Sequence, residues 1–132
     1  MKYIYEYEME VRDYECDVQG IVNNANYLHY TEHVRHKFLQ TRNVNFIDLH
    51  NRGIETVVAR VNMSFKRSLK SDDVFVCRIN MKKEHFRYVF FQDIYRKDDN
   101  ALVFKSRIDV VCLINNKLSD CEELNETFKD LL

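Results

Sequence analysis

The sequence predicts an α+β domain in which an antiparallel β-sheet packs around one long helix. One segment with a period of two precedes a single long segment with helical periodicity, and four more alternating segments follow it. Short polar turns join the later segments, which requires antiparallel neighbours and excludes an alternating βαβ arrangement. The 132 residues contain no linker and no internal repeat, so we expect a single domain spanning residues 1–132.

The central helix is predicted from the spacing of apolar residues over positions 27–42. Four of them share one helical face: Tyr27, Tyr30, Val34 and Phe38. Residues 43–53 read as a loop or a short helical turn that ends at a glycine. Near the C-terminus, Ser119 and Glu122 have the spacing of a capping box before a short second helix.

The strands are predicted from alternation. In residues 3–12, "YIYEYEMEVR", every second side chain is a tyrosine, a methionine or a valine, and the glutamates fall on the other face. Four further strands are expected at 55–66, 74–83, 86–96 and 101–115, separated by polar turns. One face of this sheet must be covered, and the long helix is the element that can cover it.

Composition excludes several classes of function. Twenty basic residues against 21 acidic ones give a net charge of −1, which provides no overall field for nucleic acid or an acidic membrane surface. No apolar run approaches the length of a membrane span, and the N-terminus is too charged for a signal peptide. The four cysteines show no CxxC spacing, as expected for reduced thiols. We therefore expect a cytoplasmic protein without nucleic-acid or membrane partners.

The least ordinary stretch is "CDVQGIVNNANYLHY", residues 16–30, directly before and within the predicted start of the helix. Asn23, Asn24 and Asn26 are all able to cap the helix, and Gly20 permits a tight turn before it. The first amides of a helix lack intrahelical partners and can polarise a carbonyl, while Asp17 nearby can act as a base or a nucleophile. The stretch therefore fits either an acyl-transfer site or a capped helix with a structural aspartate.

A longer run that includes this stretch, "VRDYECDVQGIVNNANYLHYTEHVR", resembles hotdog-fold acyl-CoA thioesterases of the 4-hydroxybenzoyl-CoA thioesterase type. The part "VNNANYL" is also similar to long-chain acyl-CoA thioesterases and plant acyl-ACP thioesterases. The resemblance is dense from Val11 to Arg35, and it implies the hotdog fold, an antiparallel sheet wrapped around a central helix.

The resemblance also implies an activity and a set of site residues. The expected reaction is hydrolysis of an acyl-CoA to a free carboxylic acid and a thiol, as in fatty acid metabolism. Asp17 falls at the position of the catalytic aspartate, acting as nucleophile or general base. Asn24 falls where a backbone N–H polarises the thioester carbonyl, and Gly20 and Val22 match the turn. The chain departs from some relatives in carrying Ile21 and Asn24 where subgroups have histidine, and Glu15 where many have aspartate.

Substrate binding is assigned to five residues: Val22, Asn23, Tyr27, Lys66 and Arg67. The two basic residues belong to "FKRSLK", which could meet CoA phosphates, as could a second cluster in "MKKEHFR". The resemblance implies a homodimer or homotetramer with the site at the subunit interface. No cofactor is expected, because CoA is part of the substrate.

Other readings remain open at this stage. An acyl-ACP thioesterase would use the same residues, and a catalytically silent acyl-CoA-binding protein would keep the fold. A hotdog dehydratase would need its own histidine motif, which the sequence lacks. His29, His33 and His36 share a helical face and could bind zinc, but a solvated stripe is the expected explanation, so no metal site is predicted. Glu32 and Arg35 are expected to form a surface or interface ion pair.

Overall fold

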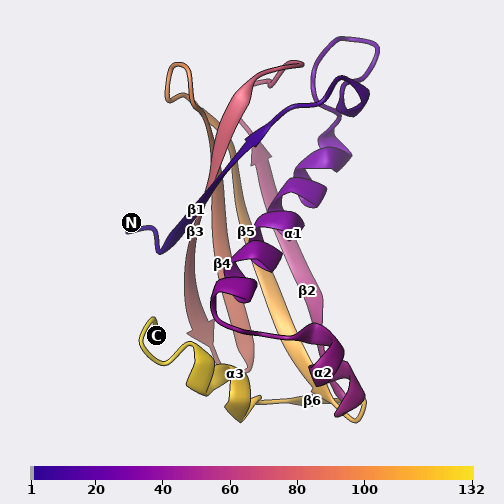
Figure 1. Cartoon of the computed structure of the whole chain (residues 1–132), viewed down its shortest axis with the longest axis vertical. Coiled ribbons are helices and arrows are strands. Elements are labelled where there is room, and N and C mark those ends of the chain that lie inside the picture. Colours follow the sequence, from indigo (N-terminus) through magenta and orange to yellow (C-terminus); the bar gives the residue numbers. More distant parts are fainter. Residues whose placement is uncertain (1) are drawn as a thin grey trace.

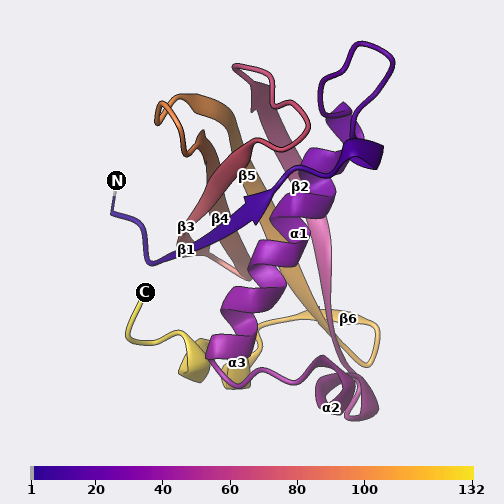
Figure 2. The same cartoon turned by 45° about the horizontal axis from the view of Figure 1, so that its top comes forward.

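The computed structural model describes residues 2–132 and has the predicted architecture. A long helix, α1 (Asn24–Thr41), lies against a curled antiparallel sheet (Figure 1). The strands are β1 (Tyr5–Glu10), β2 (Ile54–Phe65), β3 (Val74–Glu84), β4 (Arg87–Arg96), β5 (Leu102–Ile114) and β6 (Lys117–Ser119). Two short helices, α2 (Phe46–Asn51) and α3 (Glu122–Thr127), lie near the end of the molecule where α1 terminates (Figure 2).

The main path of the sheet runs β1-β3-β4-β5-β2, and β6 pairs with β5. Because β3, β4 and β5 are consecutive neighbours, the predicted hairpins between them are confirmed. The predicted hairpin between residues 55–66 and 74–83 is wrong, since β2 pairs with β5 instead. The polar turn at 70–73 does not join two paired strands. Its Asp73 carboxylate accepts a bond from the Lys70 amide at 2.8 Å, which stabilises the turn that leads into β3.

The core lies between α1 and the inner face of the sheet. The predicted face of α1 is buried as expected, together with Thr31. Tyr27 stacks on Phe104 of β5 with ring centroids 4.9 Å apart, and Tyr30 packs against Phe75 of β3 at 4.7 Å. Aromatic side chains bury more apolar surface than other residues and so contribute most to the free energy of packing. These contacts therefore hold the helix on the sheet.

The structure differs from the sequence prediction at the cap of the C-terminal helix and in two short elements. Helix α3 forms, but the predicted capping box does not, because Ser119 belongs to β6 and its hydroxyl donates to the Lys117 carbonyl at 2.8 Å. Cys121 is the N-cap residue and makes no side-chain capping bond. Two short elements were not predicted, β6 itself and a 3₁₀ turn, η1 (Asp13–Glu15), between β1 and α1.

The two edges of the sheet differ in length and polarity. At one edge, β1 is six residues long and exposes its glutamates. At the other, β2 is twelve residues long and leaves Val57 40%, Val58 49% and Phe65 43% exposed. A bulge between Val58 and Arg60 interrupts the alternation predicted for this strand. A long edge with exposed apolar side chains is the kind that another strand can cover.

Candidate active site

The loop before α1 is closed by its own backbone. The Asp17 amide donates to the Ile21 carbonyl at 2.9 Å, and the Gly20 amide donates to the Asp17 carbonyl at 3.0 Å. Gly20 has φ +78°, a left-handed conformation that glycine adopts without strain. Cys16 and Val22 form an isolated antiparallel bridge at the base of the loop. The loop is therefore a compact, hydrogen-bonded turn.

Asp17 occupies this turn with its side chain partly exposed. One carboxylate oxygen, Oδ1, accepts a hydrogen bond from the Gln19 amide at 2.8 Å. Within residues 2–132, no hydrogen bond or ion pair engages the other oxygen, Oδ2. The residue thus has one oxygen that fixes the orientation of the carboxylate and one that is available for chemistry.

Glu15, two residues earlier, has the opposite environment. It is only 9% exposed, and its Oε1 accepts bonds from the Arg12 amide at 2.7 Å and from the Tyr30 hydroxyl at 2.9 Å. Burial and the bond to Glu15 both raise the pKa of Tyr30 above its usual range, so the phenol stays protonated and keeps donating. The backbone carbonyl of Glu15 also accepts bonds from the Asn23 amide and the Asn26 side chain. Glu15 therefore fastens the loop to the first turns of α1.

The first residue of α1, Asn24, has a backbone amide without a hydrogen-bond acceptor among residues 2–132. Asn23 is the N-cap, and its side chain accepts a bond from the Ala25 amide at 3.0 Å, while the Asn26 amide donates to the Asn23 carbonyl at 2.9 Å. Within residues 2–132, the amide of Asn24 donates no hydrogen bond, and Asn24 is exposed. A free N–H at a helix start carries the positive end of the helix dipole, so it suits a developing negative oxygen.

The remaining predicted residues divide into core and surface. Val22 and Tyr27 are each 2% exposed, and Tyr27 sits in an aromatic cluster with Phe65 and Phe104. Burial is the main cause that raises the pKa of the Tyr27 phenol. Both side chains belong to the core next to the loop. Their contact with substrate stays a prediction.

The first basic cluster lies beside the loop. The Val22 amide donates to the Leu69 carbonyl at 2.9 Å, and Ile21 pairs with Lys70 in an isolated bridge. Lys66 and Arg67, just before these residues, are exposed and belong to none of the ion pairs among residues 2–132. In the second cluster, Lys82, Lys83 and Arg87 pair with Glu84, Asp120 and Asp109 respectively. The first cluster is therefore the one whose charges are free and near Asp17.

A cavity of about 270 Å³ lies further along α1, between that helix, α2, α3 and strands β2, β4 and β5. Its walls are mostly apolar and include Leu39, Val44, Phe46 and Val110. Glu32, Arg35 and His36 supply polar atoms on the α1 side. The lining residues Thr56, Val57 and Val58 come from the exposed edge strand β2, so the cavity opens at that edge of the sheet.

One polar prediction on α1, the Glu32–Arg35 ion pair, is wrong, and the helical histidines lie on the exposed face of the helix. The predicted ion pair between Glu32 and Arg35 is not among those of the described residues, because Arg35 turns inward and its Nη1 donates to Gln92 Oε1 at 2.9 Å. The three helical histidines are exposed, and His33 packs against the ring of Tyr7. No group of three or more metal-ligating side chains occurs within residues 2–132.

Sequence reasoning missed the contact between Arg35 and Gln92. Gln92 is fully buried on β4, where its Nε2 donates to the Thr31 carbonyl at 3.0 Å. The available signal was an amide in the otherwise apolar inward positions of "FRYVFFQDIYR", because a buried amide requires polar partners.

Comparison with known proteins defines the class. The family model for the Thioesterase-like superfamily matches residues 11–130, and the chain belongs to this family. Its curled sheet around one helix is the hotdog fold of that family, as the resemblance implied.

Three known proteins show how similar the chain is to individual relatives. A putative esterase from Aquifex aeolicus is 30% identical over 126 residues, which are 94% of this chain and 97% of that protein. The chloroplastic acyl-acyl carrier protein thioesterase ATL3 of Arabidopsis thaliana is 30% identical over 89% of this chain, and the match spans only 62% of the plant protein. A crystal structure of a 1,4-dihydroxy-2-naphthoyl-CoA thioesterase from Synechocystis superposes with a TM-score of 0.89 over 96% of each chain, at 14% identity. The structural likeness at that identity concerns the fold.

No helix within residues 2–132 has the length and apolar character needed to cross a membrane.

Proposed function

We propose that the protein hydrolyses an acyl-CoA thioester to the free carboxylic acid and CoA thiol. The observation that carries the proposal is the pairing of a partly exposed carboxylate at Asp17 with the free amide of Asn24. A hydrogen-bonded loop joins these two groups. Membership of the thioesterase-like family supports this reaction for such a site.

The chemistry can begin in two ways, and both use the free oxygen of Asp17. As a general base, the carboxylate takes a proton from water, and the resulting hydroxide attacks the thioester carbonyl carbon. As a nucleophile, the carboxylate itself attacks, the thiolate leaves, and water then hydrolyses the mixed anhydride. In both routes the carbonyl oxygen becomes negative and accepts a bond from the Asn24 amide, and the C–S bond breaks with the electron pair leaving on sulfur.

Substrate recognition is proposed from charge. Lys66, Arg67 and Lys70 lie next to the loop and belong to no ion pair among residues 2–132, which suits the phosphates of CoA. The Arabidopsis relatives named for acyl carrier protein thioesters make such a thioester the second candidate substrate. Both candidates present the same thioester carbonyl to Asp17 and Asn24.

The test is release of thiol from a panel of acyl-CoA and acyl carrier protein thioesters. Asp17→Asn should lower kcat by about 10²- to 10⁴-fold for every substrate that the native protein hydrolyses. Asp13→Asn is the matched control, because Asp13 is an exposed carboxylate in the same segment whose Oδ1 accepts from the adjacent Tyr14 amide. A native protein that binds the thioesters without turnover would contradict the proposal and favour a silent acyl-CoA-binding protein.

We further propose a homodimer that pairs β2 with β2 of a second copy. The exposed Val57, Val58 and Phe65 on this long edge support it. Antiparallel pairing reverses the direction of the second β2 strand. The Asp17 loop lies beside the chain that leaves the C-terminal end of β2, so the loop of one copy would approach the cavity at the N-terminal half of the other β2. A complete site would then require both copies.

A charge placed at this edge tests the dimer. Val58→Lys should give a monomer by light scattering, because a lysine at the pairing edge opposes strand addition. Glu10→Lys on the exposed face of β1 is the control and should leave the dimer intact. A native protein that is monomeric at micromolar concentration would contradict this part of the proposal.

A further inference from the structure

Arg35 is a charged residue of the cavity wall that forms no ion pair with a carboxylate within residues 2–132. Ten arginines lie in the sequence. Within residues 2–132, those outside any ion pair with a carboxylate are Arg35, Arg60 and Arg67. The other two are exposed, whereas Arg35 is partly buried in the wall of an apolar cavity. No guanidinium nitrogen of Arg35 is both buried and without a partner among residues 2–132, so its unpaired donors are accessible and can donate to an acceptor group in the cavity.

The surroundings of Arg35 hold its guanidinium in place without saturating it. Gln92 is fixed by its bond to the Thr31 carbonyl, which leaves its Oε1 to accept from Arg35 Nη1. A guanidinium has five N–H donors, and the bond to Gln92 is the one hydrogen bond that the Arg35 side chain makes within the described residues. Burial lowers the pKa of Arg35, but the group stays charged, because an arginine pKa begins far above neutral. Several donors therefore remain available to an occupant of the cavity.

The rest of the cavity indicates what that occupant is. Leu39, Val44, Phe46 and Val110 require an apolar body. The volume of about 270 Å³ is just below that of typical pockets for drug-sized ligands, so it fits a short acyl chain or a single ring. Glu32, an exposed carboxylate on the same wall, partly offsets the charge of Arg35 and can accept a bond in its turn.

We infer that the cavity binds the acyl group of the substrate and that Arg35 recognises an oxygen acceptor on that group, remote from the thioester. The inference rests on the proposed function, and it names the substrate class as an oxygenated acyl thioester rather than a plain alkyl one. A hydroxyl can accept from Arg35 and donate to Glu32, whereas a carboxylate is attracted by the first and repelled by the second. The expected order of preference is hydroxyl, then carboxylate, then methyl.

Three thioesters of equal length separate these chemistries: ω-hydroxyoctanoyl-CoA, octanoyl-CoA and the matching ω-carboxylic acyl-CoA. The native protein should hydrolyse the hydroxylated substrate with a kcat/KM about 10- to 100-fold above that for octanoyl-CoA, because only the hydroxylated acyl group can form a hydrogen bond with the charged Arg35. Arg35→Met keeps the apolar stem and should bring the ratio of kcat/KM for these two substrates to within about threefold of one, whatever its effect on octanoyl-CoA hydrolysis itself. Arg42→Met is the control, because Arg42 is the C-cap of the same helix and pairs with Asp130 away from the cavity.

The outcomes divide cleanly. Preference for either oxygenated substrate that is lost in Arg35→Met supports the inference. Equal rates for all three substrates, or a preference that survives in Arg35→Met, overturns it. An equal fall for all three, with a loss of the dimer by light scattering, also overturns it and makes Arg35 an interface residue.

A binding measurement separates this inference from the proposed function. If the native protein hydrolyses no thioester, the proposed function fails. Calorimetry with free ω-hydroxyoctanoate and octanoate then still tests the cavity. Tighter binding of the hydroxylated acid by the native protein and not by Arg35→Met supports the inference, and equal affinities overturn it.

Discussion

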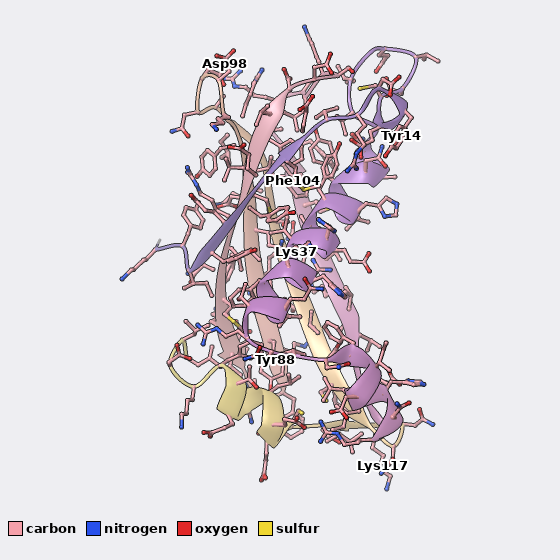
Figure 3. The ribbon with its side chains drawn as sticks, viewed as in Figure 1. Tyr14, Lys37, Tyr88, Asp98, Phe104 and Lys117 are labelled. Carbon is pink, nitrogen blue, oxygen red and sulfur yellow. The ribbon has the colours of Figure 1, made fainter. Side chains whose placement is uncertain are left out.

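The two ends of α1 are built in different ways, and we propose that they perform different tasks. At its first turn, main-chain hydrogen bonds and one buried carboxylate, Glu15, hold an exposed loop in a single shape. Three turns later, the same helix lines a cavity whose walls are side chains from several elements, including Tyr88 of β4. Figure 3 shows the separation, with Tyr14 beside the loop at one end of the molecule and Tyr88 towards the other.

In the proposed function, the loop carries out the hydrolysis and the cavity determines which acyl groups are accepted. A main-chain framework positions a carboxylate and an amide in the same way whatever acyl group is bound. A side-chain cavity can change its size and polarity by single substitutions without moving that framework. Changes at the first turn should therefore affect all substrates alike, while changes at the cavity should alter the ranking of substrates.

The largest expected effect on stability is at the loop before α1. Glu15→Ala removes the acceptor for the Tyr30 hydroxyl and the Arg12 amide, and leaves a buried donor unsatisfied. The free energy of unfolding should fall by about 3 kcal/mol, measured by urea denaturation. Glu10→Ala, an exposed glutamate on β1, should stay within about 0.5 kcal/mol of the native protein. Similar small losses for both variants would show that Glu15 does not fasten the loop.

A smaller effect is expected from filling the cavity. Val110→Phe adds volume to the wall on β5 and should lower kcat/KM for the longest acyl group hydrolysed by about tenfold or more. Acetyl-CoA, which does not reach the wall, should be hydrolysed at an unchanged rate relative to the native protein. Rates measured over a series of chain lengths check this, and a uniform fall would indicate that the cavity is not the acyl site.

The smallest effect concerns the turn itself. Gly20→Ala forces an alanine into φ +78°, but its Cβ would meet no atom within 4 Å apart from those of its two neighbours in the chain. The cost should be about 1 kcal/mol in the free energy of unfolding. Gly53→Ala has the same φ and would in addition collide with the side chain of Asn115, so its loss should be larger. An equal or greater loss at Gly20 would mean that the loop is packed more tightly than the structure shows.

Sequence periodicity was sufficient for the long helix and the five long strands, and residue types were sufficient for the position of the loop. The alternation in β1 and the helical spacing from Tyr27 to Phe38 arise from one face being buried and the other wet, which a single sequence records directly. Asp17, Gly20 and the asparagines lie next to one another in the chain, so their proximity required no tertiary information.

The failures concern partners that are distant in sequence. Whether β2 pairs with β3 or β5 depends on where residues 66–73 lead the chain, and local turn residues are compatible with both. Arg35 and Glu32 have the spacing of a helical ion pair, yet a buried amide 57 residues away competes successfully for the guanidinium. Ser119 has the spacing of a helix cap, but it pairs with Cys112 as part of strand β6 and so does not cap α3.

The central claim is that the Asn24 main-chain amide, and not its side chain, polarises the thioester carbonyl. Asn24 is the first residue of α1, where proline is well tolerated because the helix does not use that N–H. The preceding residue, Asn23, already has φ −63° and ψ 138°, in the extended region that a following proline favours. Asn24→Pro therefore deletes one N–H with little change in the fold, and Asn24→Ala deletes the side chain and keeps the N–H.

The decisive measurement is kcat for acyl-CoA hydrolysis by these two variants, with urea denaturation to confirm native stability. The account predicts a fall of about 10²- to 10³-fold for Asn24→Pro and less than about threefold for Asn24→Ala. Full activity in a stably folded Asn24→Pro variant would contradict it, as would a large loss in Asn24→Ala.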